Sequence, residues 1–328
     1  MKAIQATNIS KVFQFKIHKG LKGFLQPQTK DIVAVDNISL SVEAGESVAF
    51  IGPNGAGKST TIKMLTGILQ PTNGEILVLG KRPLQERREL AMQIGTVFGQ
   101  RSQLVFNLPL TDSFELTASM YQVPKIESAK RIKTLVQQFG LDEFISQPVR
   151  KLSLGQRMRA EVANALIHNP KIIFLDEPTI GLDIVAKRAL REVIKDVNRT
   201  QGTTVFLTSH DVGDIEEICN RTMIINHGTV VLDAQTDQLK KDYLKTKTVA
   251  VVPAGDLPRQ VEVAGVKAKP EAGRLIFAVD TARIELKTFI PKLFEQMEVA
   301  DITIEDMPLE DIIHELYTKA APEVDYDD

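Results

Sequence analysis

The chain has 328 residues, of which 43% are hydrophobic and 25% charged, and its formal net charge is -2 at pH 7. This composition is that of an ordinary globular protein and excludes disordered and collagen-like chains, while the length favours two domains. The near-neutral charge provides no overall positive field, so a DNA or RNA partner is not expected.

Residues 1–13 lack the charged start and long apolar run of a secretory signal. No stretch approaches the roughly 18 apolar residues that a membrane-spanning helix needs. The only cysteine, Cys219, cannot form an internal disulfide, and its neighbours Ile215, Ile218 and Met223 predict a buried thiol. We therefore expect a protein of the cytosol that reaches a membrane only through a partner or a surface patch.

The chain begins with strand-like patterns. Apolar and polar residues alternate over 3–15, and further strands are expected at 38–42 and 48–51. Between the first two lie residues 16–30, a basic and apolar stretch with two glycines and a proline that has the character of an insertion. It is either a solvated loop or a short amphipathic element that touches anionic lipid or a partner.

Helical spacing follows at residues 59–69, after a glycine-rich stretch. Residues 71–75 predict a turn into a strand at 75–80, and another short strand is expected at 94–99.

The next region is helical. Asp112 followed by Glu115 has the spacing of a capping box and predicts a helix from there to Met120. An apolar stripe over 132–139 predicts a second helix that ends at the following glycine. Residues 102–150 are therefore expected to form a helical insert.

Strands then alternate with helices again, which implies a mostly parallel sheet covered on both faces. The expected strands are 172–176 and 204–210, the expected helices are 185–199 and 212–219, and a hairpin covers 223–233.

The pattern changes near residue 240, after a charged run. We expect a main domain over 1–240, a separate α+β domain over 241–321 and a disordered acidic tail over 322–328. The expected strands of the second domain are 248–252, 275–280 and 300–306, and its expected helices are 284–297 and 309–319.

The strongest local signal is a phosphate-loop pattern between an expected strand and an expected helix. Its residues are Gly52, Pro53, Asn54, Gly55, Ala56, Gly57, Lys58, Ser59 and Thr60. Glycines let consecutive backbone N–H groups face one anion, and Lys58 would place a positive charge beside the β- and γ-phosphates of ATP. Ser59 would hold Mg²⁺. The alternative is a glycine-rich turn without a ligand.

Two adjacent carboxylates, Asp176 and Glu177, end the buried strand at 172–176. Because successive side chains of a strand point to different sides, the two can serve different tasks. Asp176 could orient the shell of Mg²⁺ ligands, and Glu177 could polarise a water aimed at the γ-phosphate. A solvated strand end is the alternative.

The segment LSLGQRMRAEVANAL, residues 152–166, lies about twenty residues before Asp176. On its own it predicts an amphipathic helix opened by Ser153 and Gly155, whose free N–H groups could bind an anion, although such helix starts also occur without a ligand. It resembles the signature of the ATP-binding cassette (ABC) family, usually written LSGGQ. The order of phosphate loop, glutamine segment, signature, acidic strand and histidine matches that family over roughly residues 1–240.

The resemblance implies an α/β fold, namely a P-loop NTPase ABC cassette with a helical subdomain, here followed by the small C-terminal α+β domain. It also implies that two subunits pack head to tail, so that Ser153, Gly155 and Gln156 of one subunit close on ATP held by Lys58 of the other. Leu154 departs from the usual glycine, and we expect its side chain to point away from the nucleotide.

By the same resemblance, His210 is the switch histidine that contacts the γ-phosphate and the attacking water. Asp183 matches the loop that crosses the dimer interface, although it is also an ordinary candidate for a helix cap before Ile184.

The coupling glutamine, which would reach the metal and the attacking water, is either Gln100 or Gln103, and we favour Gln100. Phe13, rather than Phe15, is the expected aromatic that stacks on the adenine ring, and both could instead be core residues.

The family implies an ATPase that works as a homodimer, or as a heterodimer with a paralogue, on separate transmembrane permease subunits at the cytoplasmic face of the cell membrane. ATP and Mg²⁺ are the expected cofactors. The signature variant and the C-terminal domain resemble those of exporter ATPases, so export of a drug, lipid or amphipathic compound is favoured. An importer ATPase is the nearer alternative, and a soluble ABC ATPase of ribosomes or chromosomes a more distant one.

Overall fold

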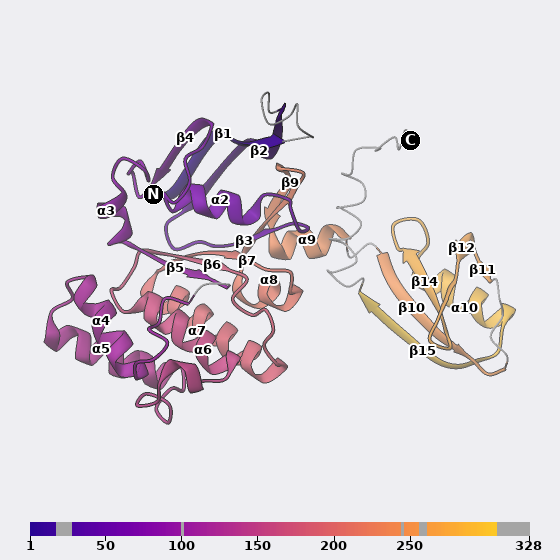
Figure 1. Cartoon of the computed structure of the whole chain (residues 1–328). Helices are drawn as coiled ribbons and strands as arrows, with labels where there is room; N and C mark the ends of the chain where they lie inside the picture. The colour runs from indigo at the N-terminus through magenta and orange to yellow at the C-terminus, as the bar shows by residue number, and fades with distance from the viewer. Residues whose placement is uncertain (18–27, 100–101, 244–245, 256–260, 307–328) are drawn as a thin grey trace. The chain divides into compact units, whose positions relative to one another are not determined.

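The computed structural model describes residues 1–17, 28–99, 102–243, 246–255 and 261–306 (Figure 1). Contacts within the chain divide it into two compact units, one built from Met1–Thr236 and one that begins at Asp237. In the parts so described, none of the helices combines the length and the hydropathy that crossing a bilayer requires.

A six-stranded sheet forms the centre of the first unit, in the order β5-β6-β7-β3-β8-β9. Its strands are β3 (Ser47–Ile51), β5 (Ile94–Phe98), β6 (Ile172–Asp176), β7 (Thr204–Thr208), β8 (Arg221–Asn226) and β9 (Thr229–Gln235). All neighbours are parallel except β8 and β9, which form the expected hairpin. The prediction of a mostly parallel sheet is therefore confirmed, and parallel pairing brings the carboxyl ends of β3, β6 and β7 to one edge.

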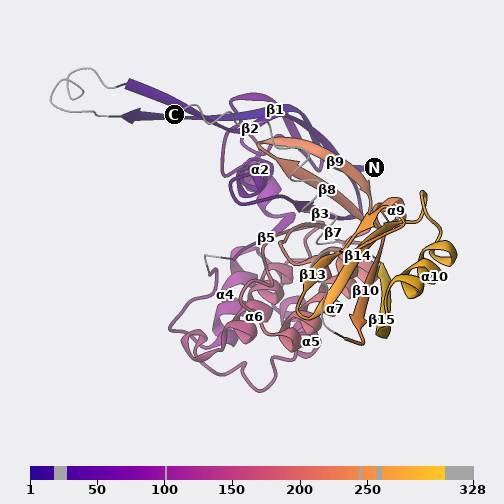
Figure 2. The same cartoon turned by 90° about the vertical axis from the view of Figure 1, so that its right-hand side faces the viewer.

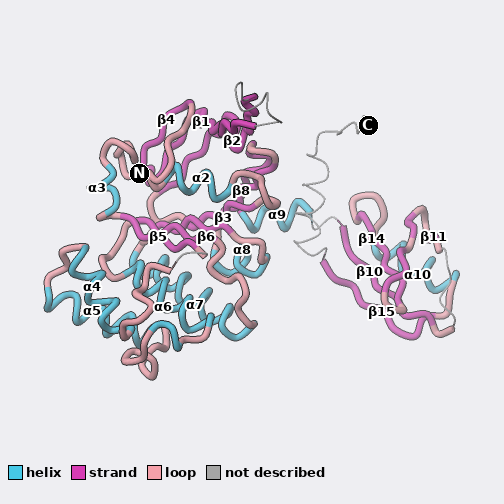
Figure 3. The backbone as a smooth tube through the Cα atoms, in the orientation of Figure 1, coloured by secondary structure: helices cyan, strands magenta, loops and turns pink. Residues whose placement is uncertain are grey.

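Helices cover both faces of this sheet, as Figure 1 and Figure 3 show. α2 (Lys58–Leu65) lies on one side, and α6 (Leu154–Leu166), α7 (Ile184–Gln201) and α8 (Val212–Ile218) lie on the other. Cys219, at the end of α8, is buried as predicted, and burial raises the pKa of its thiol well above the ordinary value.

A second, antiparallel sheet was not predicted. It has the order β2-β1-β4 and consists of β1 (Lys2–Ile17), β2 (Gln28–Glu43) and β4 (Asn73–Val78). One face of it packs on the main core, because residues such as Ile4, Ile9 and Ile38 join the same buried cluster as Phe50 and Phe174. The alternating pattern of these strands is that of a half-buried antiparallel sheet, whereas the parallel strands are buried on both faces.

The stretch 16–30 was expected to be an insertion, but both of its ends belong to paired strands. β1 and β2 remain paired from Lys11 opposite Val35 to Ile17 opposite Gln28, so residues 16–17 and 28–30 belong to one long hairpin. Figure 2 shows this hairpin running out past the rest of the antiparallel sheet. Residues 18–27 lie outside the described residues.

The helical insert contains α4 (Leu110–Met120) and α5 (Lys125–Gln138). The short 3-10 helix η1 (Val149–Lys151) follows them along the chain and precedes α6. The predicted capping box at Asp112 is wrong, because α4 begins at Leu110 with Pro109 at its N-cap. Leu110 is fully buried and its N–H donates to the Gln147 carbonyl at 3.0 Å, so tertiary contacts start the helix one turn earlier than the local pattern.

Most other elements of the first unit lie within a few residues of their predicted bounds. However, β2 begins ten residues before the expected strand 38–42, α5 begins at Lys125 and not at Ile132, and the short α3 (Arg87–Ala91) was not expected. One helix and one strand end clearly earlier than predicted. α2 stops before Gly67, whose φ is +71°, and β7 stops at Thr208, which leaves Ser209 and His210 in a loop.

The second unit has its own antiparallel sheet in the order β13-β14-β10-β15. The strands are β10 (Thr246–Pro253), β13 (Lys269–Glu271), β14 (Arg274–Asp280) and β15 (Val299–Asp306), with a small hairpin of β11 (Glu262–Val263) and β12 (Val266–Lys267). α10 (Leu286–Gln296) packs Phe289 against Phe277 at 5.4 Å between ring centroids. α9 (Thr236–Tyr243) precedes the sheet. The expected helix at 309–319 and the tail 322–328 lie outside the described residues.

Candidate active site

The loop between β3 and α2 is shaped by close contacts that only glycine allows. A Cβ on Gly52 would lie 2.2 Å from the Ile225 carbonyl oxygen, and one on Gly57 would lie 2.4 Å from that of Ala34. Gly57 also has a φ of +104°, in the left-handed region that side chains disfavour. In the described part of the chain no side chain caps the first turn of α2, so its N–H groups face the loop. This is the arrangement that binds a phosphate at a helix start.

Lys58 begins α2 and folds back over the loop. It is 5% exposed, and its Nζ donates to the carbonyl oxygens of Gly52 at 2.7 Å and Pro53 at 3.3 Å. Burial lowers the pKa of this amine, while the nearby carboxylates of Glu177 and Asp176 act in the opposite direction. The ammonium is thus held at the centre of the loop, where a phosphate would meet it.

Asp176 and Ser59 come together across the sheet edge. Asp176 Oδ1 accepts hydrogen bonds from Thr208 Oγ1 at 2.6 Å and from Ser59 Oγ at 3.3 Å. A hydroxyl and a carboxylate at this distance are oxygen ligands of the kind that Mg²⁺ prefers. The residues present therefore fit the predicted metal position.

Glu177 follows Asp176 at a left-handed turn of the chain. Its φ is +54°, a left-handed backbone that costs a non-glycine residue about 1–3 kcal/mol. Two hydrogen bonds hold its N–H in place, to Thr208 O at 3.0 Å and Thr208 Oγ1 at 3.2 Å. Strand alternation predicted that the two carboxylates would point to different sides, but it did not predict this left-handed turn.

His210, in the loop after β7, reaches the same point. Its Nε2 lies 3.0 Å from Lys58 Nζ and 3.0 Å from Glu177 Oε1, and Lys58 Nζ is 4.0 Å from Glu177 Oε1. A single ring nitrogen accepts from the ammonium or donates to the carboxylate, according to the tautomer. A cation, a carboxylate and an imidazole therefore meet at one side of the loop, in a group that could hold a phosphate and orient a water.

A cavity of about 220 Å³ adjoins this group. The residues that line it come from the loops after β6 and β7 and from α7, and they are Glu177, Thr179, Ile180, Gly181, Lys187, Ser209, His210 and Asp211.

The tip of α6 is built differently. Ser153 is its N-cap: Ser153 Oγ accepts from the Gln156 N–H at 3.2 Å, and Gln156 Oε1 accepts from the Ser153 N–H at 2.9 Å. Ser153 is exposed. Gly155 lies close to α7, since a Cβ there would be 3.1 Å from the Ala186 Cβ. Leu154 is 42% exposed and its Cδ2 lies beside Gly181. The prediction that this segment opens a helix is confirmed.

Asp183 caps α7, and its carboxylate accepts from the Ala186 N–H at 2.8 Å. The next two residues are apolar and stand in solvent, with Ile184 85% and Val185 79% exposed. The helix-cap interpretation of Asp183 is therefore confirmed, and two apolar side chains are exposed directly after this cap.

Gln100 lies outside the described residues. Gln103 turns back onto β5, where its amide donates to Thr96 O at 2.8 Å and Thr96 Oγ1 at 3.1 Å. Phe13 is half-buried on β1 with Lys11 Nζ 5.3 Å from its ring centroid, and Phe15 is 51% exposed.

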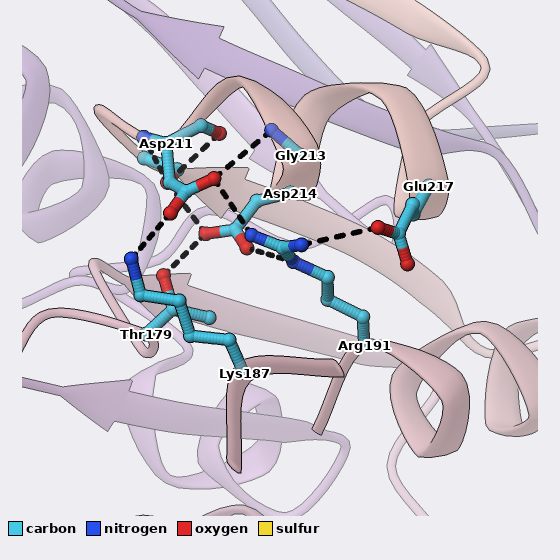
Figure 4. A network of polar contacts seen from close by, with 8 residues as sticks. Thr179, Lys187, Arg191, Asp211, Gly213, Asp214 and Glu217 are labelled. Carbon is cyan, nitrogen blue, oxygen red and sulfur yellow. Dashed lines mark hydrogen bonds and ion pairs between the residues drawn. The ribbon is translucent and has the colours of Figure 1, made fainter. Parts of the chain in front are cut away.

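Sequence reasoning missed two sets of residues. One is Thr208, which holds both Asp176 and the Glu177 backbone. The other is a polar network around Asp211 that joins α7 to the loop of His210 (Figure 4). Its signal was present as two cations four residues apart on one helix, Lys187 and Arg191, together with the carboxylates that follow His210.

Comparison with protein families matches residues 35–180 to the family described as ABC transporter. The chain is 33% identical over 214 residues to the ABC transporter ATP-binding protein NatA of Bacillus subtilis (strain 168), a match that covers 65% of this chain and 87% of that protein. It is 32% identical over 208 residues to the bacitracin transport ATP-binding protein BcrA of Bacillus licheniformis, covering 63% of this chain and 67% of that protein.

Two further similarities bear on the assignment. The methionine import ATP-binding protein MetN of Geobacillus kaustophilus (strain HTA426) is 33% identical over 210 residues, covering 63% of this chain and 61% of that protein. Among solved structures, a dimeric ATP-binding cassette, MJ0796, in a post-hydrolysis state with ADP and Pi, has a TM-score of 0.61 at 26% identity, covering 71% of this chain and 98% of that chain. The loop, the acidic strand end and the α6 tip thus all lie in a region shared with transporter ATPases, and the chain belongs to the ATP-binding ATPase subunits of ABC transporters.

Proposed function

We propose that this subunit hydrolyses ATP at the group formed by Lys58, Glu177 and His210, and that it does so as one half of a dimer that drives export. The observation that carries the proposal is the meeting of these three side chains within 4.0 Å of one another beside the glycine loop. Phosphoryl transfer to water requires a cation that holds the γ-phosphate, a carboxylate that takes up a proton and a group that orients the attacking water, here an imidazole.

Each residue has a task in this proposal. The N–H groups of residues 52–60 and the Lys58 ammonium bind the phosphates, and Ser59 and Asp176 hold Mg²⁺, which neutralises charge on the phosphate oxygens. Glu177 Oε1 accepts a proton from the attacking water, and His210 Nε2 donates to a γ-phosphate oxygen. Gln100 completes the metal and water positions, and the Phe13 ring stacks on adenine.

The second half of the site comes from a partner in this proposal. Ser153, Gly155 and Gln156 of the partner close on the nucleotide, and the partner is an identical copy or a paralogous ATPase. The exposed Ser153 and the exposed apolar pair after Asp183 support an interface here. The dimeric state of the similar cassette MJ0796 adds support.

Export through separate transmembrane permease subunits, at the cytoplasmic face of the membrane, is the favoured direction. The similar proteins include one named for bacitracin transport and one named for methionine import, so similarity to them does not choose between directions. The second unit supports export: it combines a sheet with the helix α10, whereas importer ATPases often carry an all-β extension.

The chemistry is tested by Glu177→Gln. The amide keeps the size of the side chain but takes no proton from water, so hydrolysis should fall by about 10²- to 10⁴-fold. ATP binding should persist, and the variant should accumulate as an ATP-bound dimer in sedimentation velocity. Undiminished turnover would refute the role of Glu177, and a variant that stays monomeric at saturating ATP would refute the closed dimer.

The direction is tested in inside-out membrane vesicles from cells that contain the subunit with its native membrane partners. ATP is added outside, together with amphipathic fluorescent dyes and a fluorescent phospholipid. Export predicts accumulation of a probe inside the vesicles that depends on ATP and is absent with Glu177→Gln. Probe release from preloaded vesicles on addition of ATP would instead indicate import.

We also propose that the second unit, within residues 241–321, regulates the ATPase or steadies the dimer. Its own buried core, with Val249, Phe277 and Phe289, supports a separate domain. Deletion of residues 245–328 should change dimerisation or the hydrolysis rate. Unchanged dimerisation together with an unchanged rate of ATP hydrolysis would refute this proposal.

A further inference from the structure

The loop that carries His210 is tied to α7 by a network of charged side chains (Figure 4). Arg191, in the middle of α7, donates from Nε to Asp214 Oδ1 at 2.6 Å and from Nη2 to Asp211 Oδ1 at 2.6 Å. Its third nitrogen, Nη1, donates to Glu217 Oε1 at 3.1 Å. Lys187, one helical turn earlier, donates to the other oxygen of Asp211 at 2.5 Å. One guanidinium therefore joins three carboxylates across two elements.

The residues on both sides of His210 are part of this network. Asp211 follows it directly, and its N–H donates to Ser209 Oγ at 2.9 Å. Ser209 precedes His210 and donates to Asp214 Oδ2 at 2.6 Å. The two neighbours of the histidine are thus fixed to each other and to Asp214, while the imidazole itself is left to reach Lys58 and Glu177.

The network also reaches the strand end of Glu177. Thr179 Oγ1, two residues after Glu177, donates to Asp214 Oδ2 at 2.5 Å. The side chain of Asp214 is fully buried and that of Arg191 is 11% exposed, so solvent screens this pair little. Arg191 is therefore the cation that pairs directly with this buried carboxylate.

We propose that Arg191, with Lys187, is a positioning residue for ATP hydrolysis: it locks the loop of His210 to α7, so that the imidazole stands where it meets the γ-phosphate. This inference rests on the proposed function of His210.

Gly213 offers a way to disturb the lock without removing a charge. It lies against the guanidinium, and a Cβ there would be 2.5 Å from Arg191 Nη1 and 2.7 Å from Nη2. Gly213 lies in the first turn of α8, where Ala is a better helix former than Gly. Gly213→Ala should therefore displace the guanidinium while leaving the helix at least as stable.

The experiment compares Arg191→Lys and Gly213→Ala with Arg199→Gln in the full-length subunit with its native membrane partners. Arg199 is the control, because it lies on the same helix, is 78% exposed and contacts only Asp196 among the interactions described. Arg191→Lys keeps the charge but lacks the planar fork. We expect both test variants to lower kcat by about 10- to 100-fold, since a misplaced catalytic group costs on this scale. KM for ATP should stay near wild type in both test variants, and Arg199→Gln should match wild type throughout.

A double-mutant cycle with His210→Ala separates positioning from general structure. If Arg191 acts through the histidine, Arg191→Lys should have little further effect on kcat once His210→Ala is present. Equal effects in both backgrounds, or a fall in ATP affinity in place of kcat, would overturn the inference while leaving the proposed function intact. Unchanged kcat in His210→Ala alone would instead overturn the assigned role of His210, and with it this inference.

Discussion

The starts of α2 and α6 are both helix N-termini in glycine-bearing loops, but they are built in opposite ways. At α2, Gly52 and Gly57 press against backbone carbonyls of neighbouring strands, and Lys58 is buried over the loop. At α6, Ser153 and Gln156 satisfy each other's backbone N–H groups in solvent. The start of α2 therefore has its anion-binding groups within one chain. At the start of α6, the polar side chains instead bond to the backbone of their own helix.

This contrast indicates what each helix start can bind within a single chain. Free N–H groups around a buried cation form an anion site inside a single chain. A capped and exposed helix tip meets a nucleotide only when another molecule brings one. Changes at the α2 loop should therefore be felt in the stability of the isolated subunit, and changes at the α6 tip mainly in the activity of the assembled dimer.

The largest effect on stability is expected for Gly57→Ala. The left-handed backbone costs alanine about 1–2 kcal/mol, and the contact with the Ala34 carbonyl adds about 1–3 kcal/mol of overpacking. Gly55→Ala is the matched control, since its φ is also positive, at +82°, but among the described residues no atom lies within 4 Å of the added Cβ. Urea unfolding without nucleotide should show a clearly larger loss for Gly57→Ala, and equal losses would mean that the close contact does not matter.

Much of this part of the fold follows from local sequence. The loop residues 52–60 and the strand end at Asp176 and Glu177 could be predicted because each is a short pattern between a strand and a helix. The antiparallel sheet could not, because β1 pairs with β4 about 70 residues away and nothing local records that partner. The start of α4 was misplaced for a related reason, since burial of Leu110 outweighed the cap pattern at Asp112.

In the candidate site, too, local sequence predicted some features and missed others. Its principal side chains are recognisable by type and spacing, but the left-handed turn at Glu177 and the support from Thr208 depend on the adjacent strand. The Arg191 network depends on how α7 and α8 pack. Sequence therefore identified the groups that could act on ATP and missed the residues that hold them in position.

A smaller effect on stability is expected at His168, which lies two residues after the C-terminal end of α6 (Leu154–Leu166). His168 stacks on Tyr121 at 3.7 Å and its Nε2 lies 3.0 Å from the Ile94 carbonyl oxygen. Burial lowers the pKa of His168 to about 4, and the charge of Arg131 acts in the same direction while the bond to Ile94 opposes it. The imidazole is therefore neutral in the folded chain at neutral pH.

The direction in which the free energy of unfolding changes with pH follows from proton binding. The unfolded histidine takes up a proton near its ordinary pKa of about 6.5, so the stability that the neutral ring supports is present above that pH and is lost as the pH falls toward 4. At about 1.4 kcal/mol per pKa unit, the loss between pH 7 and pH 4 is about 3 kcal/mol. His168→Phe keeps a ring beside Tyr121 and should reduce the pH dependence of the unfolding free energy by this amount. An equal slope in wild type and His168→Phe would contradict the assignment.

The smallest effect on stability is expected at the α6 tip, where three substitutions of Ser153 separate capping from contact with nucleotide. Ser153→Ala removes the acceptor for the Gln156 N–H and should cost about 1 kcal/mol, whereas Asn and Asp cap a helix about as well as Ser. Ser153→Asn and Ser153→Asp should therefore unfold like wild type. Their activities should differ, because an aspartate carried by the partner would face the phosphates of ATP and like charges in contact repel strongly. Hydrolysis should fall about 10-fold or more in Ser153→Asp relative to Ser153→Asn. Equal rates in these two variants would mean that the tip serves only its own helix, and that the half of the site expected from the partner lies elsewhere.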